Sequence, residues 1–316
     1  MPRRDSWIRI AFGSWLITTL FALAACGGHS VMQPMPPATP TPMPMMAADH
    51  VVLVVLENHS ASDVLGNSAM PYFNSLVTRY SLAANYFANT HPSIGNYFML
   101  TTGQIESNDD NFSGAISDDN IVRALNSAGK SWKAYVESVP TPGYTGGDVY
   151  PYAKHHNPFS YLTDVLDSPS VAANLMPMTQ LSLDLMSGTL PAFAFVLPNL
   201  KNDAHDCPGG GMSCADAAKL AAADAWLKTQ IDPLLNSPAF ANSLLIITWD
   251  EGNNSDIANG GGQVATVLAG PRAKAAFQSS TLFQHEATLR LILDLLQVSD
   301  HPGASAVAPS MAELIR

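Results

Sequence analysis

The sequence predicts an α/β fold with a largely parallel central sheet covered by helices on both faces. Short apolar runs rich in β-branched residues alternate with stretches in which apolar residues recur every three or four positions. The apolar runs are hydrophobic throughout, which is typical of parallel strands buried on both faces. With 47% hydrophobic residues among 316, the chain can bury a large core within one main domain.

The predicted elements alternate along most of the chain. Strands are expected at residues 51–56, 82–87, 131–136, 193–197, 244–249 and 264–269. Helices are expected at residues 70–80, 93–102, 118–128, 178–187, 215–235 and 284–297. Residues 105–170, rich in Gly, Pro, Asn and Tyr, are expected to form loops over the functional face, around a possible edge strand at 131–136.

The first residues have the pattern of an export signal. A basic start is followed by a nearly uncharged run at 10–25 that ends in Leu23-Ala24-Ala25-Cys26. We expect a signal peptide at 1–25, because this run is shorter than the roughly 20 apolar residues that cross a bilayer. The small residues before Cys26 resemble a bacterial lipobox, which implies lipidation of Cys26. Ordinary cleavage nearby is the alternative.

The rest of the chain divides into a linker and one domain. Residues 26–48 are rich in Pro and Met, carry no charge and favour a semi-extended spacer after the lipidated cysteine. The folded domain is expected at 49–316. This organisation predicts an exported protein that is attached to the membrane of the cell envelope through its lipid.

Charge and cysteine content narrow the partners and the compartment. The net charge is −11, and removal of residues 1–25 would leave 12 basic and 25 acidic residues. So acidic a chain is not expected to bind nucleic acid. Cys207 and Cys214 lie seven positions apart in a glycine-rich segment, and export favours a local disulfide between them.

Acidic and amide side chains follow two of the predicted strands. Glu57 and Asn58 come directly after the strand at 51–56, and Asp250 and Glu251 come directly after the strand at 244–249. Because ligands bind at the carboxyl ends of strands in α/β sheets, these residues are expected to converge. Carboxylates held close together need a cation, which predicts a metal with mostly oxygen ligands. Each acid taken alone also fits a solvated or capping role.

Ser93 lies near the start of the helix expected at 93–102. The free backbone amides and the dipole of a helix N-terminus favour anions, so Ser93 is a candidate for chemistry on a phosphate. A plain N-cap serine is the alternative.

Six short motifs resemble those of the bacterial phosphoesterase family, in the same order and with similar spacing. They are Glu57-Asn58-His59-Ser60, His91-Pro92-Ser93 with Asn96-Tyr97, His156-Asn157-Pro158-Phe159, Pro198-Asn199 with Asn202-Asp203 and His205-Asp206, Trp249-Asp250-Glu251-Gly252, and His285. This family includes acid phosphatases and non-specific phospholipases C, and its fold is similar to that of the alkaline phosphatase superfamily. The resemblance covers residues 49–298 and makes 49–316 the catalytic domain.

The resemblance implies roles for individual residues. Ser93 matches the nucleophile, with Thr90 as a weaker competitor. The implied metal ligands are Glu57, Asn58, Ser93, Asp250 and Glu251. The implied catalytic histidines are His156 and His205, and the implied substrate-binding residues are Asn96, Asn199, Asp203, Asp206 and His285. The set from His156 to Asp206 would orient phosphate, protonate the leaving alkoxide or hold a second cation, and His285 also fits a structural role.

One position departs from the family pattern. Relatives often carry His or Arg after the glycines that precede the last predicted strand, whereas this chain has Gln263 after residues 260–262. Because Gln is a poor zinc ligand, this change favours one hard ion such as Ca²⁺, Mg²⁺ or Mn²⁺ over a two-zinc centre, although zinc stays possible.

The function expected from the resemblance is a metal-dependent phosphomonoesterase that works through a phosphoserine intermediate. A phospholipase C-type diesterase acting on phospholipid headgroups is the first alternative. A catalytically silent surface lipoprotein is the second alternative.

Overall fold

The computed structural model describes residues 47–316. The predicted signal peptide, Cys26 and residues 27–46 of the predicted linker lie outside the described residues. None of the helices within 47–316 is long and apolar enough to cross a membrane.

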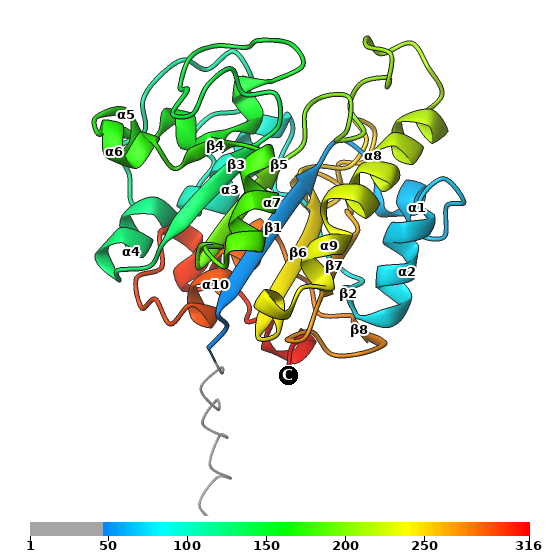
Figure 1. Cartoon of the computed structure of the whole chain (residues 1–316). Helices are drawn as coiled ribbons and strands as arrows, with labels where there is room; N and C mark the ends of the chain where they lie inside the picture. Colours follow the sequence, from blue (N-terminus) through cyan, green and yellow to red (C-terminus); the bar gives the residue numbers. More distant parts are fainter. Residues whose placement is uncertain (1–46) are drawn as a thin grey trace, which may run out of the picture. The chain divides into compact units, whose positions relative to one another are not determined.

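A single eight-stranded sheet forms the centre of the domain (Figure 1). Its order is β4-β3-β5-β1-β6-β7-β2-β8, and every pairing is parallel except the two that β7 makes with β6 and β2. The strands are β1 (His50–Leu56), β2 (Ser81–Ala83), β3 (Trp132–Val136), β4 (Leu175–Pro177), β5 (Phe193–Leu197), β6 (Ser243–Trp249), β7 (Thr266–Ala269) and β8 (Phe277–Ser279).

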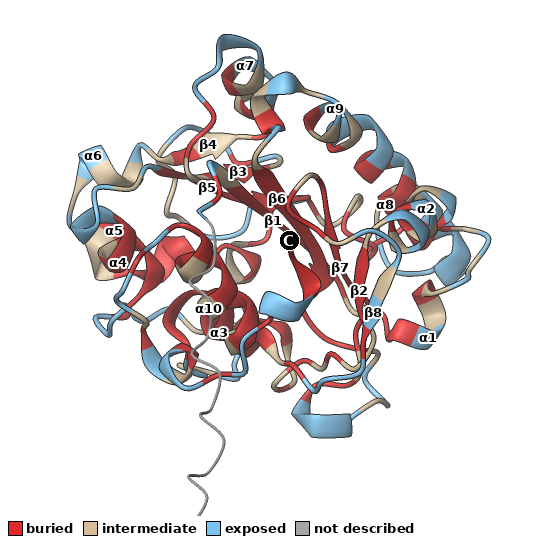
Figure 2. Cartoon of the chain, turned by 90° about the horizontal axis from the view of Figure 1, so that it is seen from below, coloured by how far each residue is buried: buried red, intermediate tan, exposed pale blue. Residues whose placement is uncertain are grey.

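Helices cover both faces of this sheet. Figure 2, which looks along the sheet, shows α3, α4 and α10 on one side and α2, α7, α8 and α9 on the other. The α-helices are α1 (Ala61–Val64), α2 (Pro71–Arg79), α3 (Ser93–Thr102), α4 (Ile121–Ser127), α5 (Thr163–Leu166), α6 (Pro169–Ala172), α7 (Thr179–Ser187), α8 (Asp216–Gln230), α9 (Asp232–Leu235) and α10 (His285–Leu295). Short 3₁₀ turns are η1 (Lys154–His156), η2 (Pro158–Tyr161), η3 (Pro238–Phe240), η4 (Ala258–Gly260), η5 (Gly303–Ala306) and η6 (Ala312–Leu314).

The predicted fold class is confirmed, and several details of the prediction were wrong. The strand at 131–136 is not at the edge, because β4 pairs outside it. The helix predicted at 215–235 is two helices, α8 and α9, which meet at Ile231 ahead of Pro233. A proline at this place cannot donate the backbone hydrogen bond that would continue α8.

The two central strands place the polar residues that follow them. Every residue of β6 is buried, and so is every residue of β1 except His50, as strands covered on both faces require. The backbone N–H of Asp250 donates to Leu56 O at 2.9 Å, and that of Glu57 donates to Asp203 O at 2.7 Å. The loops that follow β5, β1 and β6 therefore meet at one edge of the sheet.

Candidate active site

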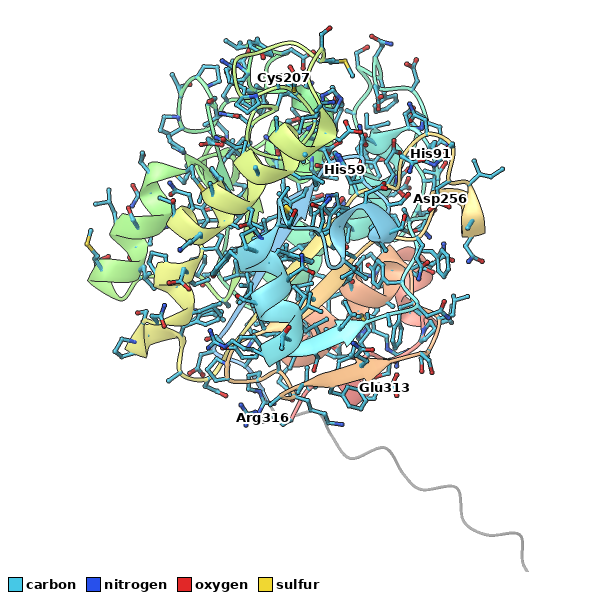
Figure 3. The ribbon with its side chains drawn as sticks, turned by 90° about the vertical axis from the view of Figure 1, so that its right-hand side faces the viewer. His59, His91, Cys207, Asp256, Glu313 and Arg316 are labelled. Atoms are coloured by element: carbon cyan, nitrogen blue, oxygen red, sulfur yellow. A yellow bond between two sulfur atoms is a disulfide. The ribbon has the colours of Figure 1, made fainter. Side chains whose placement is uncertain are left out.

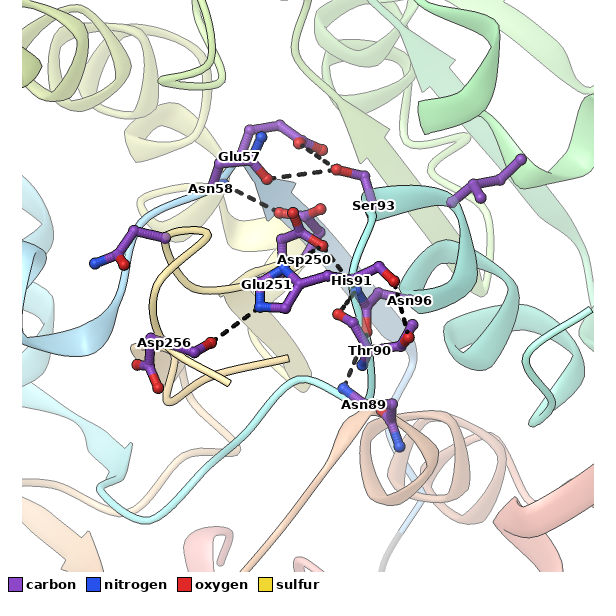
Figure 4. Close-up of polar contacts among 12 residues, drawn as sticks. Glu57, Asn58, Asn89, Thr90, His91, Ser93, Asn96, Asp250, Glu251 and Asp256 are labelled. Atoms are coloured by element: carbon purple, nitrogen blue, oxygen red, sulfur yellow. Dashed lines mark hydrogen bonds and ion pairs between the residues drawn. The ribbon is translucent and has the colours of Figure 1, made fainter. Parts of the chain in front are cut away.

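Three carboxylates converge at this edge, as the sequence predicts. Glu57, Asp250 and Glu251 are 0%, 0% and 2% exposed, so none of them is solvated (Figure 4). Asp250 Oδ1 accepts a hydrogen bond from the backbone N–H of Asn58 at 3.1 Å, and Glu57 Oε1 accepts one from the Tyr97 hydroxyl. The cluster thus joins the residues that directly follow β1 and β6 to a residue of α3.

Ser93 is the first residue of α3 and faces the carboxylates. Its Oγ donates to Glu57 Oε2 at 3.2 Å and lies 3.4 Å from Asn58 Oδ1. The hydroxyl of Thr90 instead donates to the carbonyl of the next residue at 3.2 Å. Of the two candidate nucleophiles, Ser93 is therefore the one whose oxygen contacts the cluster.

The start of α3 already holds one anion. The free backbone N–H of Ile94 donates to Asp110 Oδ1 at 3.1 Å, and Asp110 belongs to the long segment between α3 and α4. This contact places an oxygen of Asp110 at the residue after Ser93, where the backbone amides of a helix N-terminus favour anions.

Burial makes it costly for these carboxylates to be charged together. Burial, with added repulsion from Asp250 and Asp203, raises the pKa of Glu57 well above its usual value. Burial also raises the pKa of Asp250 to about 7 and, with repulsion from Asp250, that of Glu251 to about 10. A protein cluster of this kind is stable either when protonated or when a cation neutralises it.

The oxygen atoms of the cluster suit a hard cation. Asp250 Oδ2 is buried and has no hydrogen-bond partner. One end of the Asn58 side-chain amide lies 3.2 Å from both Glu57 Oε2 and Glu251 Oε1. If this end is the nitrogen, it donates to both carboxylates. If it is the oxygen, it completes a set of oxygen ligands for a cation. Between residues 47 and 316, no three His, Cys, Asp or Glu side chains form a metal site by themselves. A cation here would therefore also need Asn58 and Ser93.

His156 and Asp203 form a buried extension of the cluster. His156 Nε2 lies 3.4 Å from Glu57 Oε1, and its Nδ1 lies 3.6 Å from Asp203 Oδ2. The His156 ring stacks on Tyr97 with centroids 5.3 Å apart. Burial lowers the pKa of His156 well below its usual value, so the ring is neutral. His156 Nε2 and Asp203 Oδ2 are buried and form no hydrogen bond within the described residues, so both atoms are available to a ligand of the cluster.

His205 is the more accessible of the two predicted catalytic histidines. Its Nδ1 lies 2.8 Å from Asp206 Oδ1, and Tyr150 donates to the other Asp206 oxygen at 3.1 Å. The backbone N–H of His205 donates to Asp203 Oδ1 at 2.8 Å. Together with Asn58, His205 lines a cavity of about 500 Å³. A carboxylate on Nδ1 leaves Nε2 as the free nitrogen, an arrangement that suits proton transfer.

Two predicted substrate-binding amides are used inside the protein. Asn96 Oδ1 accepts from Asn89 N at 2.9 Å, and its Nδ2 donates to Thr90 O at 2.9 Å. Asn199 Nδ2 donates to Ser138 Oγ at 2.9 Å. These contacts hold the loops around Ser93 and after β5, so substrate binding by Asn96 and Asn199 stays a prediction.

His285 is fully buried at the first position of α10. Its Nε2 lies 2.7 Å from the backbone oxygen of Asp250, and its Nδ1 lies 3.1 Å from the Tyr86 hydroxyl. Burial lowers the pKa of His285 to about 4. Both ring nitrogens of His285 are thus hydrogen-bonded within the protein, and the side chain is not exposed. His285 therefore fits the structural role of holding the backbone of Asp250 better than the predicted contact with substrate.

The structure adds two residues for which the sequence supplied no role. Tyr97 donates to Glu57. His91 Nδ1 lies 3.1 Å from Glu251 Oε2, and its Nε2 lies 2.9 Å from Asp256 O (Figure 4). Tyr97 stands four positions after Ser93 on a helix, so that spacing was a usable signal. The partner of His91 is far away in the sequence and left no such signal.

The glycines before β7 have a packing role. A Cβ at Gly260 would lie 2.0 Å from Asn89 O, and one at Gly261 would lie 2.4 Å from Thr90 O. Only glycine allows the two backbones to approach this closely. Gln263 Nε2 donates to Ala84 O at 2.8 Å, away from the carboxylates.

Cys207 and Cys214 form a disulfide in the structure, with Cα atoms 5.9 Å apart. It closes the loop between His205 and the start of α8, at the side of the molecule that Figure 3 shows with His59 and Cys207.

Comparison with known proteins finds relatives of this chain among phosphatases. The phosphatidylinositol-3-phosphatase of Mycobacterium tuberculosis is 32% identical over 271 residues, which cover 84% of this chain and 82% of that protein. A probable acid phosphatase of Kluyveromyces lactis is 28% identical over 276 residues, covering 82% of this chain and 62% of that protein.

A solved structure of a protein in the alkaline phosphatase superfamily from Vibrio parahaemolyticus matches with a TM-score of 0.57 and 15% identity. The match covers 81% of this chain and 68% of the other, and it shows that the fold is alkaline phosphatase-like. The model of the Phosphoesterase family matches residues 63–299, a span that includes Ser93, His205 and Asp250. The chain therefore belongs to the Phosphoesterase family.

Proposed function

We propose that this phosphoric ester hydrolase is a metal-dependent phosphomonoesterase of the acid phosphatase type that forms a phosphoserine intermediate. The observation that carries the proposal is the position of Ser93 Oγ, 3.2 Å from Glu57 in a buried cluster of oxygen atoms. Relatives named as phosphatases support the monoester class and argue against a silent surface protein.

The residues present would share the reaction as follows. Ser93 Oγ gives its proton to Glu57 and attacks phosphorus, the bond from phosphorus to the alcohol oxygen breaks, and His205 donates a proton to the leaving oxygen. Water then attacks phosphorus while His205 takes up its proton, the bond from phosphorus to Ser93 Oγ breaks as Glu57 returns the proton to Oγ, and phosphate leaves. The phosphoryl group would replace Asp110 at the backbone N–H of Ile94, and this N–H and His156 would orient its oxygens in both steps.

A divalent cation would be held by Glu57, Asn58, Ser93, Asp250 and Glu251. When bound, it would neutralise charge on the phosphoryl oxygens and lower the pKa of the serine hydroxyl. The oxygen-rich set favours Ca²⁺, Mg²⁺ or Mn²⁺ over zinc.

An assay of the purified chain with p-nitrophenyl phosphate tests this function. We expect phosphate release that Ser93→Ala abolishes, that Thr90→Val retains, and that chelation removes until a divalent metal is added back. Full activity of Ser93→Ala would refute the proposed nucleophile. Faster hydrolysis of bis-p-nitrophenyl phosphate than of the monoester would show a diesterase of the phospholipase C type instead.

We also propose that the protein is exported and anchored to the cell envelope through lipid on Cys26, as the sequence before that residue indicates. Expression of Cys26→Ser should remove labelling by radioactive fatty acid and move the protein from the membrane fraction to the soluble fraction. Equal labelling of the variant and the parent would contradict the proposal.

A further inference from the structure

Basic side chains gather at the end of the domain opposite the proposed reaction centre. The reaction centre lies at the carboxyl ends of β1 and β6, whereas Arg79 lies just before β2 and Lys274 just before β8. Two successive antiparallel pairings make β2 parallel to β6, and β8 is parallel to β2, so both residues lie at amino ends of strands. Figure 3 shows Arg316 at the same lower end of the domain and His91 of the site at the upper end.

Backbone hydrogen bonds join these residues into one corner. Ala276 N donates to Arg79 O at 3.2 Å, and Lys274 N donates to Leu314 O at 3.0 Å, two residues before Arg316. We call Arg79, Lys274 and Arg316 the basic corner.

The basic corner lies beside the first described residues of the chain. Arg316 N donates to Arg272 O at 3.0 Å, and Arg272 N donates to Ser243 O at 3.2 Å. The next residue back, Asn242, donates from Nδ2 to Ala47 O at 3.3 Å. The predicted spacer to the lipid therefore joins the domain at its basic end.

The side chains of the basic corner are available to an outside partner. Arg79 and Arg316 are exposed and Lys274 is half-buried. No ion pair within the described part of the chain includes any of the three. Arg79 Cζ lies 5.0 Å from the centroid of the Tyr80 ring, and Lys274 Nζ lies 4.8 Å from that of Phe277. Basic groups beside aromatic rings suit the headgroup region of a bilayer.

Acidic side chains are placed differently. Near the basic corner, Asp49 accepts from Asn242 Nδ2 at 3.1 Å, and Glu313 accepts from Ser279 Oγ. At the opposite end, carboxylates line both the cavity beside His205 and a second cavity near the start of α3; they are Asp63 and Asp216 in the first, and Asp110 and Asp148 in the second. An anionic surface is therefore repelled by the end that carries the site.

The two ends are far enough apart to act separately. The seven residues of β1 alone span about 20 Å. The Debye length is about 10 Å at 0.1 M salt. A surface in contact with the basic corner is thus attracted by that corner, while repulsion from the acidic end is largely screened.

We propose that the basic corner binds the phosphate headgroups of an anionic bilayer, so that the reaction centre opens away from the membrane that holds the protein. This inference rests on the proposed lipid anchor at Cys26. A spacer of twenty residues, 27–46, does not by itself dictate which side of the domain faces the bilayer. The lipid and the basic corner together supply the two signals that stable attachment needs. Substrate then reaches the site from the aqueous side.

Sedimentation with vesicles tests the basic corner without the lipid. The full chain with Cys26→Ser should bind vesicles of phosphatidylcholine and phosphatidylglycerol more tightly than vesicles of phosphatidylcholine alone, and salt should weaken this preference. Adding Arg79→Gln, Lys274→Gln and Arg316→Gln should lower the partition coefficient on the anionic vesicles about tenfold or more, since each cation near such a surface contributes a factor of about five.

A second triple variant is the matched control. Arg123→Gln, Lys154→Gln and Lys201→Gln remove the same charge outside the basic corner, and the two lysines also lie over tyrosine rings. This variant should keep the partition coefficient. An equal loss in both triple variants, or equal binding to neutral and anionic vesicles, would overturn the proposal.

The orientation is measured on the lipidated full chain in anionic vesicles. A fluorophore is attached at Ala275→Cys in the basic end or at Ile257→Cys in the loop before β7, both exposed positions, while Cys207 and Cys214 stay protected in their disulfide. Nitroxide on the lipid headgroups should quench the label at 275 more strongly than that at 257, and the substitutions in the basic corner should remove the difference. Equal quenching in the parent protein would also overturn the proposal.

These results separate the inference from the proposals on which it rests. Absence of fatty-acid labelling at Cys26 together with a preference of the unlipidated chain for anionic vesicles would refute the anchor and leave the basic corner standing. Hydrolysis of p-nitrophenyl phosphate should be equal in the parent and in the variant of the basic corner. Loss of that preference with hydrolysis intact would refute the basic corner alone.

Discussion

The contact between Tyr97 and Glu57 shows how a single residue prepares the site. Burial, together with the nearby negative charge of Glu57, raises the pKa of the Tyr97 hydroxyl well above its usual value, so the hydroxyl keeps its proton. It therefore acts as a permanent hydrogen-bond donor to Glu57 and fixes the direction of that carboxylate. The opposite oxygen of Glu57 is then left for Ser93.

Removal of this hydroxyl is expected to weaken metal binding. Hydrogen bonds that orient metal ligands commonly contribute a factor of 10–100 in affinity, so Tyr97→Phe should raise the metal concentration for half-maximal activity about tenfold or more. Metal titrations of the chelated enzyme measure this shift. Tyr80→Phe, which removes a half-buried hydroxyl bonded only to Arg79, serves as the control. An unchanged titration curve for Tyr97→Phe would show that the hydroxyl has no such role.

The sequence pattern predicted some of the site residues but not others. Glu57 and Asp250 follow long buried strands, and parallel strands end at one edge, so their convergence followed from the pattern. Tyr97 and His91 act through partners that only the tertiary fold brings near. For His285 the sequence left both substrate contact and a structural role open, because a sequence pattern does not distinguish a ring that faces a ligand from one that bonds a backbone carbonyl.

At the scale of elements, an ion pair fastens α7 to the sheet. Asp184 of α7 accepts from Lys133 Nζ at 2.5 Å and from the Tyr135 hydroxyl at 2.6 Å, and both partners belong to β3. Burial alone would raise the pKa of Asp184, but these hydrogen bonds outweigh that effect and hold its pKa below the usual value. The charged form is therefore favoured by folding.

This depressed pKa predicts how stability changes with acidity. The contribution of Asp184 is complete above the unfolded pKa of about 3.9 and is lost as pH falls through the lower folded value. Asp184→Asn should destabilise the protein by about 2 kcal/mol at pH 7, and the difference from the parent should shrink below about pH 4. Urea unfolding at pH 7, 5 and 3 measures it.

Asp119→Asn is the control for this experiment, because Asp119 is 71% exposed and pairs with Arg123 at the surface. Its removal should change stability by less than about 0.5 kcal/mol. An equal loss for Asp184→Asn at pH 7 and pH 3 would contradict the ionic origin of the effect.

The disulfide loop is a second element whose contribution is measurable. The Cys207–Cys214 bond closes a short loop between His205 and α8. Replacing both cysteines by serine should lower the free energy of unfolding by about 2 kcal/mol, through the regained freedom of the unfolded chain. Because Met212 of this loop lines the same cavity as His205, KM for p-nitrophenyl phosphate should also rise. Unfolding curves and kinetics that match those of the parent would show that the loop is ordered without the bond.

Long strands were easier to predict from the sequence than short strands. The strands β1 and β6 have seven residues each and were predicted almost to their ends. The strands β4 and β8 have three residues each, too few to show any periodicity, and were missed, whereas the equally short β2 overlaps the start of the strand predicted at 82–87. The antiparallel direction of β7 was also beyond prediction, since it depends on the path of the chain between β6 and β7.

Across the whole molecule, the site joins segments that are far apart in the sequence. Glu57 directly follows β1, Ser93 begins α3 and Asp250 directly follows β6, and each must be in place before the oxygen cluster exists. The unfolded chain cannot assemble this set, so a cation that binds there binds the folded state alone. Its binding free energy then adds to the stability of the entire domain.

This coupling predicts that divalent metal raises the melting temperature of the full chain. At a concentration 100 times the dissociation constant, the added stability is about 2.7 kcal/mol, which corresponds to roughly 5 °C or more for a domain of this size. Differential scanning fluorimetry of the chelated protein with Ca²⁺, Mg²⁺, Mn²⁺ or Zn²⁺ measures the shift. Glu251→Gln should abolish this metal-induced rise. It should not lower the metal-free melting temperature, because it removes a buried carboxyl group whose charged form is disfavoured in the folded protein. The control Asp300→Asn, at an exposed residue, should keep the rise. A melting temperature that no divalent ion changes would refute the proposed metal site, because the three elements would then be held together by protein contacts alone.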